Sequence, residues 1–484
     1  MSDSLQFDVV VLGAGPAGEV CAGRLAEADL SVALVERELV GGECSYYACM
    51  PSKGLLRPAQ ALAEARRVSG AAEAASGRLD VAAVLTRRDE IVHGLEDSAQ
   101  MPWVQDHGIE LFRGEGELVG ERLLRVGDRT LRARRAIVLA PGTRAGLPPI
   151  PGLEQAAPWT NREATTSKTV PDSLLVLGGG VVAVELAQAY ATLGAQVTLF
   201  ETLERLISRE EPFASELLQQ ALETQGVQVE LGVKAIAVRR GVEAAGSEGV
   251  GSEAQGSEAL GSTARADGAA GRVTLDLRDG RSFEAEQLLV AVGREPRTED
   301  LGLDSVGLDT GGYIEVDEQL RVPGKDWLYV VGDANGRVLL THMGKYQARL
   351  VADAILGEPS TLRSDGALSP RVIFTEPQIA AVGHTLASAR AEGLSVRAVD
   401  HALDANAGAS FVAHGAPGTA RLVIDNERSL IVGATFCGVD VAEFLHAATI
   451  AMIGEVPLER LAHAVPCFPT RSEVWLGLLQ KALQ

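Results

Sequence analysis

Two cysteines stand five residues apart, Cys44 and Cys49, in the run GGECSYYACMPSK that spans residues 41–53. Cytosolic thiols normally stay reduced, so a pair at short spacing in an oxidoreductase pattern more often does redox chemistry than staples a fold. On an ideal helix, residues five apart point well away from each other, and a bond between them requires a distorted turn, for which Pro51 supplies a reason. The alternative is two buried, reduced thiols near a helix start. The elements around the cysteines favour the redox disulfide.

A complete dinucleotide-binding unit precedes the cysteines. Residues Phe7 to Leu12 are typical of a buried strand that runs into a glycine-rich turn, and a helix and a second strand, Ser31 to Glu36, follow. The first glycine permits the tight turn, the second lets backbone N–H groups approach a pyrophosphate, and the third allows close packing of the helix. At the end of the second strand a carboxylate can accept from a ribose hydroxyl. The predicted nucleotide-binding residues are Gly13, Gly15, Pro16, Ala17, Gly18, Glu36, Arg37 and Gly42.

The same pattern occurs a second time, which implies two dinucleotides. Ser173 to Leu177 is the expected strand, residues 178–183 form the loop, and Val197 to Glu201 is the second strand. Glu201 would take the adenosine ribose hydroxyls and repel a 2′-phosphate, which favours NADH. Arg205 lies one helical turn on and could bind a phosphate instead, so NADPH stays open. The predicted contacts in this unit are Gly178, Gly180, Val181 and Glu201.

Length and charge limit what surrounds these units. A chain of 484 residues suggests about three domains, and its 46% of hydrophobic residues is ample for sizeable cores. The net charge of −21 repels phosphate backbones and anionic lipids, so neither nucleic acid nor a membrane is expected as a partner. The chain starts without a signal-like region and has no long apolar run, which predicts a cytoplasmic protein. Five cysteines without a second close pair predict no metal site.

A low-complexity segment separates two expected strands, Val233 to Arg240 and Arg272 to Leu277. It repeats Gly-Ser-Glu at five-residue intervals. The repeat predicts a flexible hairpin insertion at about 243–271, of a kind that usually has no specific function.

A further strand is expected over residues 327–334, and it ends in Gly332 and Asp333. As a bare dipeptide, Gly-Asp is turn chemistry. An acid at the carboxyl end of a sheet strand, however, faces the ligand crevice in this type of fold.

With two fingerprints, the CxxxxCxPSK run and the Gly-Asp strand in this order, the chain resembles the pyridine nucleotide-disulfide oxidoreductases. This flavoprotein group contains lipoamide dehydrogenase, glutathione reductase and mercuric reductase. The resemblance covers nearly the whole chain and implies an α/β fold with two Rossmann-like dinucleotide-binding domains, for FAD and NAD(P)H, and a C-terminal α+β dimerisation domain of a homodimer. The implied boundaries are 1–150 and 292–357 for FAD, 151–291 for NAD(P)H, and 358–484 for the interface.

The resemblance also implies roles for individual residues. Cys44 matches the thiol that meets the substrate, and Cys49 matches the thiol against the flavin. Lys53 and Glu185 match the family's buried pair near the reactive end of the isoalloxazine, and Asp333 matches the acid that binds the ribityl chain. A helix N-terminus and a nearby cation lower a thiol pKa, so that the thiolate can donate into the oxidised flavin. The remaining cofactor-binding residues implied are Gly142, Gly293 and Gly332.

The chain departs from the family near its C-terminus. Disulfide reductases of the family carry a His-Pro-Thr-x-x-Glu signature, contributed by the partner subunit, whose His shuttles a proton to and from the substrate thiol. Here Phe468 stands at the His position, and sliding the alignment puts Val465 there and loses Glu473. Glu473 remains a catalytic candidate, although Thr470 and Glu473 also match a capping box.

Two nearby side chains are candidate replacements for the missing base. His463 precedes Phe468 by five residues, and Cys467 is adjacent to it. A structural role is favoured for both, as an ordinary histidine and as a buried core cysteine. General acid–base catalysis contributes ~10²- to 10⁴-fold, so slow reduction of dithiol substrates is expected.

The sequence therefore predicts an FAD-dependent oxidoreductase that passes electrons from NADH through flavin and dithiol to a small-molecule acceptor, such as a quinone. The first alternative is a dihydrolipoyl dehydrogenase or another small-disulfide reductase. The second is a flavin-binding redox sensor or structural subunit without efficient turnover. The acceptor, the choice between NADH and NADPH, the physiological direction, and compensation by His463 or Cys467 stay open.

Overall fold

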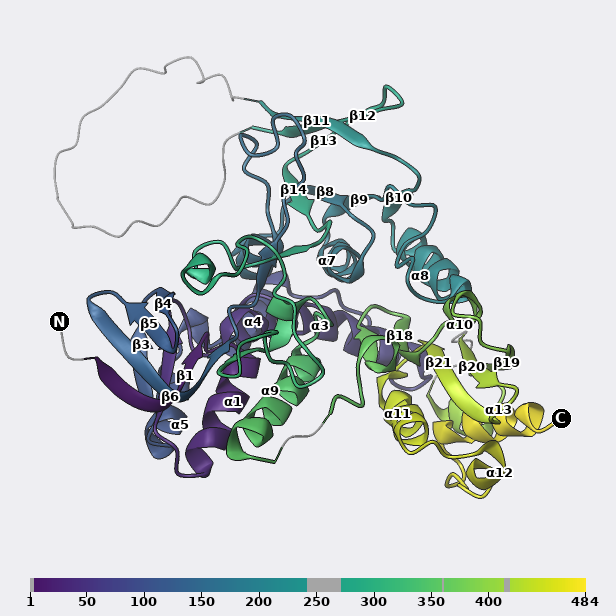
Figure 1. Ribbon diagram of the computed structural model, residues 1–484. Helices are drawn as coiled ribbons and strands as arrows, with labels where there is room; N and C mark the ends of the chain where they lie inside the picture. The colour runs from purple at the N-terminus through teal and green to yellow at the C-terminus, as the bar shows by residue number, and fades with distance from the viewer. Residues whose placement is uncertain (1–3, 242–270, 359–360, 413–417) are drawn as a thin grey trace, which may run out of the picture.

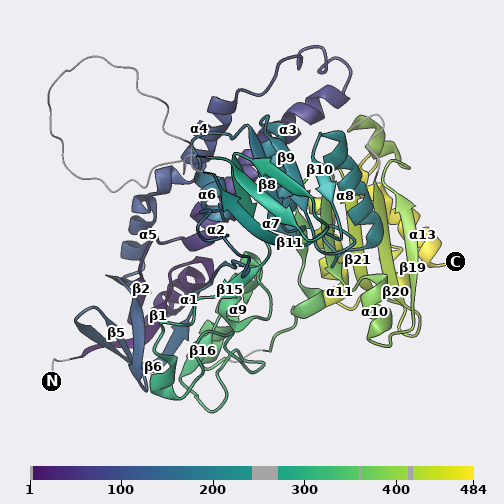
Figure 2. The same cartoon turned by 90° about the horizontal axis from the view of Figure 1, so that it is seen from above.

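The computed structural model describes residues 4–241, 271–358, 361–412 and 418–484. Figures 1 and 2 show a first sheet and a C-terminal sheet on opposite sides of the molecule, with a second parallel sheet and helices α3 and α7 between them. The predicted insertion at about 243–271 falls outside the described residues, except for Gly271 at its end.

The first sheet has the strand order β3-β2-β1-β6-β5-β4, and β16 also pairs with β6. Strands β3, β2, β1, β6 and β16 run parallel, and β1 is buried on both faces, as its continuous apolar run Val9–Val11 predicts. Helices α1 and α9 pack side by side. The strands of this sheet are β1 (Leu5–Leu12), β2 (Val32–Glu36), β3 (Glu110–Arg113), β4 (Gly116–Gly120), β5 (Leu123–Val126), β6 (Arg129–Leu139) and β16 (Leu328–Val330).

The helices of this region include the two that carry the cysteines, α2 (Gly42–Tyr46) and α3 (Cys49–Arg67). The other helices are α1 (Pro16–Glu27), α4 (Val81–Ile91), α5 (Met101–Asp106) and α9 (Thr341–Leu356).

The second sheet is parallel throughout, with the order β10-β9-β8-β14. A three-stranded antiparallel sheet, β11-β12-β13, lies in the chain between β10 and β14. The two-stranded ribbon β7-β15 forms where the chain enters and leaves this region. The strands are β7 (Thr143–Ala145), β8 (Ser173–Leu177), β9 (Gln196–Phe200), β10 (Gln228–Glu230), β11 (Ala235–Arg240), β12 (Val273–Leu277), β13 (Ser282–Ala285), β14 (Gln287–Val290) and β15 (Arg294–Pro296), and the helices are α6 (Asn161–Thr166), α7 (Val181–Thr192) and α8 (Pro212–Thr224).

The C-terminal sheet is antiparallel, with the order β17-β18-β21-β20-β19, and a separate apolar core joins it to its helices. Its elements are β17 (Arg371–Ile373), β18 (Gln378–Gly383), α10 (Leu386–Ala391), β19 (Val396–Ala402), β20 (Thr419–Asp425), β21 (Leu430–Gly438), α11 (Leu445–Ile453), α12 (Leu458–Leu461) and α13 (Val474–Ala482). The 3₁₀ helices are His93–Leu95, Ser98–Gln100, Leu303–Val306, Gly332–Asn335, Gly366–Leu368, Ala407–Phe411, Ala442–Phe444 and Arg471–Glu473.

The expected strands are present, with ends that differ by one or two residues from the prediction in most cases. The exception is the strand expected over 327–334, which ends at Val330. Gly332 adopts a left-handed conformation with φ of 72° and opens the 3₁₀ helix Gly332–Asn335, so Asp333 lies on a turn and not on the strand. No helix in the described ranges combines the length and the apolar character that crossing a bilayer requires.

Candidate functional site

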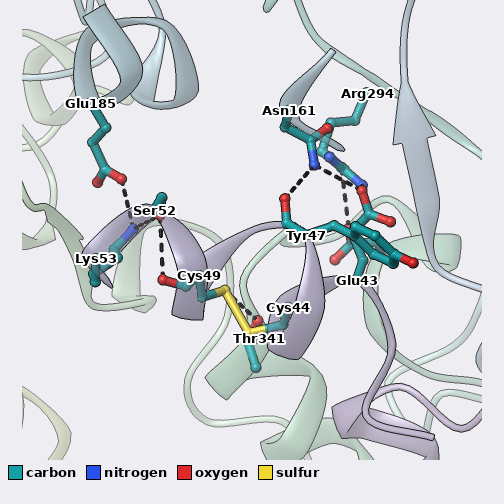
Figure 3. The surroundings of a disulfide bond; sticks show 11 residues. Glu43, Cys44, Tyr47, Cys49, Ser52, Lys53, Asn161, Glu185, Arg294 and Thr341 are labelled. Atoms are coloured by element: carbon teal, nitrogen blue, oxygen red, sulfur yellow. Dashed lines mark hydrogen bonds and ion pairs between the residues drawn. A yellow bond between two sulfur atoms is a disulfide. The ribbon is translucent and has the colours of Figure 1, made fainter. Parts of the chain in front are cut away.

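The two cysteines lie on separate helices that meet at a break. Cys44 lies within α2, Cys49 is the first residue of α3, and a disulfide joins them with their Cα atoms 4.8 Å apart (Figure 3). The chain breaks at Ala48, where φ is −133° and ψ is −95°. Pro51 lies in the first turn of α3, where its missing N–H would have no helical partner in any case. The distorted turn expected between the cysteines is this break, and Pro51 disfavours a helix that continues through it, because a proline ring clashes with the carbonyl four residues before it.

The sulfur of Cys49 faces a second helix start. Thr341 is the first residue of α9, and its Oγ1 lies 3.5 Å from the Cys49 Sγ (Figure 3). Cys49 is thus at the N-terminus of its own helix and within hydrogen-bond reach of a hydroxyl. Both features favour a thiolate at this sulfur once the disulfide is reduced. Sequence reasoning missed Thr341, which is 292 positions away from Cys49.

An ion pair lies beyond the disulfide along α3. The Lys53 Nζ donates to the Glu185 Oε2 at 2.7 Å, and the Glu185 Oε1 accepts the Phe374 N–H at 2.9 Å. The Lys53 ammonium also lies 4.7 Å from the centre of the Phe374 ring. The side chain of Glu185 is 4% exposed and that of Lys53 is 33% exposed. Glu185 thus binds side-chain and backbone donors from α3 and from the C-terminal region.

The first fingerprint forms a tight turn around an acid. A Cβ at Gly13, where φ is 100°, would lie 2.2 Å from the Ala140 carbonyl oxygen, whereas one at Gly15 would meet nothing within 4 Å. The Glu36 carboxylate accepts the N–H groups of Ala14 and Glu38, both at 2.7 Å. Gly13 is therefore required for chain packing, and Gly15 opens the backbone to the space in front of the turn.

The second fingerprint repeats this geometry. A Cβ at Gly178 would lie 2.4 Å from the Ala291 carbonyl oxygen. The Glu201 carboxylate accepts the N–H groups of Gly179 at 2.5 Å and Leu203 at 2.8 Å. Arg205 donates to the carbonyls of Ser208 at 2.8 Å and Glu210 at 3.3 Å. Its guanidinium therefore binds the backbone of its own loop.

Asp333 lies against the ribbon β7-β15. The Thr143 hydroxyl donates to the Asp333 Oδ2 at 2.6 Å, and the Arg294 Nε donates to the Thr143 Oγ1 at 2.6 Å. Burial raises the pKa of the Asp333 carboxyl, although the Thr143 hydrogen bond acts in the opposite direction. The carboxyl is thus held in place by neighbours from β7 and β15, the two strands through which the chain enters and leaves the second region.

A polar cluster that sequence reasoning missed flanks Cys44. The Arg162 Nε and Nη2 donate to the Glu43 Oε2 at 2.9 and 2.7 Å, and the Asn161 Nδ2 donates to the Glu43 Oε1 at 2.9 Å. Burial by itself raises the pKa of Glu43, but the hydrogen bonds from Arg162 and Asn161 outweigh it and hold the pKa below its usual range. Thr160 and Glu163 form a capping box that starts α6, and this pattern is visible in the sequence, but nothing local indicates which segment α6 contacts.

Comparison with known proteins decides the family. The model of the pyridine nucleotide-disulphide oxidoreductases matches residues 7–348, and the model of their dimerisation domain matches residues 369–478. The chain belongs to this family. The oxidoreductase is 32% identical over 494 aligned residues to a dihydrolipoyl dehydrogenase of Chlorobaculum parvum, with 100% of this chain and 98% of the relative covered. It is 29% identical to a mercuric reductase of Staphylococcus aureus, with 96% and 81% covered.

Solved structures show the same fold. The HOCl-induced flavoprotein disulfide reductase RclA from Escherichia coli matches with a TM-score of 0.81 and 24% identity, over 98% of this chain and 99% of that chain. LpdA from Mycobacterium tuberculosis matches with a TM-score of 0.81 and 23% identity, over 99% of both chains. The predicted family, fold class, enzyme class and use of FAD and NAD(P)H are confirmed for this oxidoreductase.

The site of the oxidoreductase fits two dinucleotides. One cavity of about 2580 Å³ is lined by both fingerprints, the disulfide, Lys53, Glu185 and Asp333. A pocket for one small ligand is typically ~300–1,000 Å³, so this space accommodates both cofactors. Gly15 and Gly180 have open space where a Cβ would stand, as backbone approach to a pyrophosphate requires.

The C-terminal segment of the oxidoreductase differs from expectation in two respects. Cys467 is exposed in this chain, so its expected burial is wrong. The capping box is also wrong: the Thr470 hydroxyl donates to the Cys467 carbonyl at 2.6 Å, and the Glu473 carboxylate accepts the Gly408 N–H at 3.2 Å. Phe468 is 77% exposed.

Proposed function

We propose that this oxidoreductase passes electrons from NADH through its flavin and the Cys44–Cys49 dithiol to a small acceptor that needs little proton delivery, such as a quinone. The proposal rests on the alignment register that retains Glu473, in which Phe468 stands at the position of the proton-shuttling histidine. Val465, which takes that position in the other register, is equally apolar and is 78% exposed. A quinone offers a flat apolar surface and accepts electrons without a disulfide bond having to open.

The protein side of the mechanism follows from the contacts around the disulfide. FAD, when bound, accepts a hydride from NAD(P)H and supplies two electrons for the disulfide. Reduction by two electrons breaks the S–S bond, and one proton completes the Cys44 thiol while Cys49 is left as a thiolate. The start of α3 and the Thr341 hydroxyl stabilise negative charge on the Cys49 sulfur, and Glu185 holds the Lys53 ammonium in the cavity.

In this proposal the predicted catalytic residues are Cys44, Cys49, Lys53, Glu185 and Glu473. Glu473 accepts a backbone N–H, which favours a structural contribution for this residue. The residues proposed to bind the cofactors are Gly13, Gly15, Pro16, Ala17, Gly18, Glu36, Arg37, Gly42, Lys53 and Asp333 together with Gly142, Gly178, Gly180, Val181, Glu201, Gly293 and Gly332.

NADH is the proposed nucleotide. The Glu201 carboxylate lies directly after β9 and would repel a 2′-phosphate. Arg205, the candidate phosphate ligand, donates to two backbone carbonyls of its own loop. Both observations favour NADH over NADPH.

We also propose a homodimer. The chain carries the family's dimerisation domain, and large apolar side chains are exposed on the described part of it. They are Phe411, Ile450, Ile453, Val465, Phe468 and Leu476. The boundaries at about 150, 291 and 357 and the cytoplasmic location stay predictions of the sequence.

The test is NADH oxidation by the purified holoenzyme with lipoamide and, in parallel, with a soluble quinone, each repeated with NADPH and with Cys44→Ser. We expect quinone turnover with little lipoamide turnover and a preference for NADH. Efficient lipoamide turnover that disappears in Cys44→Ser would sink the proposal and establish a disulfide reductase. Bound FAD that NADH does not reduce would instead support a redox sensor. Quinone turnover that survives in Cys44→Ser would show that electrons leave directly from the flavin.

One observation favours dihydrolipoyl dehydrogenase activity as the second candidate. The 32% identity to the Chlorobaculum parvum enzyme extends over the whole chain. This activity requires a base in place of Phe468, and His463 is the candidate. An unchanged lipoamide rate after His463→Ala would exclude His463 from that role.

A further inference from the structure

Helix α6 contacts the segment that carries Cys44 on both sides of that cysteine. The Asn161 Nδ2 donates to the Glu43 carboxylate at 2.9 Å and to the Tyr47 carbonyl at 2.8 Å (Figure 3). The Thr165 hydroxyl donates to the same Tyr47 carbonyl at 3.0 Å. These contacts bind the residue before Cys44 and the carbonyl at the end of α2.

The two residues of α6 that make these contacts are buried, and the helix that carries them is itself held by hydrogen bonds. Asn161 is 5% exposed and Thr165 is 1% exposed. The Arg88 guanidinium, which is fully buried, donates to the carbonyls of Thr165 at 2.7 Å and Ser167 at 2.8 Å. A short helix that would fray in isolation is thus fixed at its C-terminal end by a cation, where the helix dipole favours positive charge.

The other end of α6 is tied to the second nucleotide-binding sheet. The Trp159 N–H donates to the Leu288 carbonyl at 2.7 Å, and the Val290 N–H donates to the Trp159 carbonyl at 2.8 Å. Trp159 is therefore paired with β14 two residues before α6 begins. The helix forms a rigid connection between this sheet and the break between α2 and α3.

We propose that α6 is a positioning element for the redox disulfide, in which Asn161 and Thr165 are positioning residues. While the S–S bond exists, it holds Cys44 near Cys49 by itself. When the bond opens, the hydrogen bonds from α6 to Glu43 and Tyr47 are what keep the two sulfurs within reach. The inference rests on the disulfide as the redox centre and not on the identity of the acceptor.

The balance of the reaction sets the direction of the effect. Two glutathione thiols supply two electrons and two protons, the Cys44–Cys49 bond breaks, two protein thiols form, and one glutathione disulfide is released. Closure of the protein disulfide is favoured when its two thiols stay close together. Removing the hydrogen bonds from α6 to the Cys44 segment raises the conformational entropy of the dithiol form, but it raises that of the covalently closed disulfide form only a little. The equilibrium therefore moves toward the dithiol.

The test is a redox titration of the holoenzyme in glutathione buffers, with free thiols trapped by alkylation and counted by mass spectrometry. Thr165→Val removes the hydroxyl at constant size, and Asn161→Ala removes the amide. Each is expected to shift the equilibrium constant at least threefold toward the dithiol, and the double variant about tenfold, or about 30 mV. The matched control is Thr166→Val on the same helix, whose hydroxyl donates to the Arg162 carbonyl at 2.7 Å and whose loss should shift the constant less than twofold.

The conservative variant separates positioning from general damage. Thr165→Ser keeps the hydroxyl and should titrate like the wild type. If Thr165→Val retains FAD and titrates within twofold of the wild type, or if Thr165→Ser shifts as much as Thr165→Val, the proposal is wrong. If Asn161→Ala loses FAD, the comparison of Thr165→Val with Thr165→Ser decides alone. The titration uses neither NADH nor an acceptor, so its failure is distinguishable from failure of the proposed function.

Discussion

In the proposed alignment register, replacing Phe468 with histidine puts an imidazole at the position of the family's proton shuttle. Because Phe468 is 77% exposed in the single chain, its side chain contributes little to the packing of the monomer, and the change is expected to alter the free energy of unfolding of the monomer by only about 0.5 kcal/mol. A positioned general acid–base contributes about 10²- to 10⁴-fold to a rate. Phe468→His should therefore accelerate reduction of dithiol substrates.

The size of the gain depends on Glu473. In the family signature this carboxylate orients the imidazole, but here it accepts the Gly408 N–H at 3.2 Å. Part of the orientation is therefore missing, and we expect the lower end of the range, about 10- to 100-fold in kcat/KM for lipoamide. Such a gain corresponds to about 1.4–2.7 kcal/mol of transition-state stabilisation.

The assay is steady-state NADH oxidation by the holoenzyme with lipoamide, measured from pH 5.5 to 9. The variant should show a new ionisation near the ordinary histidine value of about 6.5, whereas its quinone rate should stay within about twofold of the wild type. Val465→His is the matched control, since Val465 is as exposed as Phe468 but belongs to the other register. If Phe468→His binds FAD fully but gains less than threefold in kcat/KM for lipoamide, the argument is refuted. If only Val465→His gains activity, the alignment that places Phe468 at the histidine position is wrong.

Two further predictions concern buried charge. Burial raises the pKa of Glu19 to about 7 from an ordinary 4.5, so its stabilising contribution is complete below about 4.5 and is lost as the pH rises through about 7. Glu19→Gln should remove this loss, seen as a thermal midpoint above that of the wild type at pH 8 but not at pH 4.5, and equal midpoints at pH 8 would contradict it. Lys53→Met leaves the buried Glu185 carboxylate without its cation. Breaking a fully buried pair lowers the free energy of unfolding by about 3–5 kcal/mol, and because Lys53 is 33% exposed we expect a loss of about 2 kcal/mol here. Urea unfolding measures the loss, and Glu185→Gln added to Lys53→Met should recover part of it, whereas no loss in Lys53→Met would show that the pair contributes nothing.

The nucleotide-binding units could be predicted because their signals are local. The strand predicted at Ser173 to Leu177 has those bounds in the structure, since a buried apolar run and the glycines that follow it define both ends. Gly13 and Gly178 must be glycines because the backbone carbonyls of Ala140 and Ala291 lie where a Cβ would stand. The fingerprint encodes this close backbone approach in a few consecutive residues.

The partners of the disulfide could not be predicted in the same way. Thr341 reaches Cys49 across 292 positions, and Asn161 reaches Tyr47 across 114. Threonine and asparagine are common on helix starts, so neither residue type indicates such a contact. Only the folded chain shows that α6 and α9 begin beside the break between the two cysteines.

The errors near the C-terminus have a common physical origin. A capping box is one of several arrangements open to Thr470 and Glu473, and other hydrogen-bond partners competed for both side chains. The Thr470 hydroxyl bonds the carbonyl of Cys467, and the Glu473 carboxylate bonds the N–H of Gly408 from a distant segment. Sequence spacing alone does not weigh a local partner against one that folding brings in.

The pairing of β16 with β6 bears on how the chain is made. Leu328 pairs with Ile137, so about 190 residues separate them. At ribosomal rates of ~5–20 residues per second, the edge of β6 at residues 137–139, which β5 does not pair, waits roughly 10–40 s for its neighbour. The strands β8, β9, β10 and β14 all emerge within that interval and can close their own sheet. An unpaired strand edge can pair with other chains. The nascent protein is therefore expected to be most vulnerable to aggregation and to chaperone binding before residue 328 emerges, and pulse proteolysis of ribosome-bound chains would detect this.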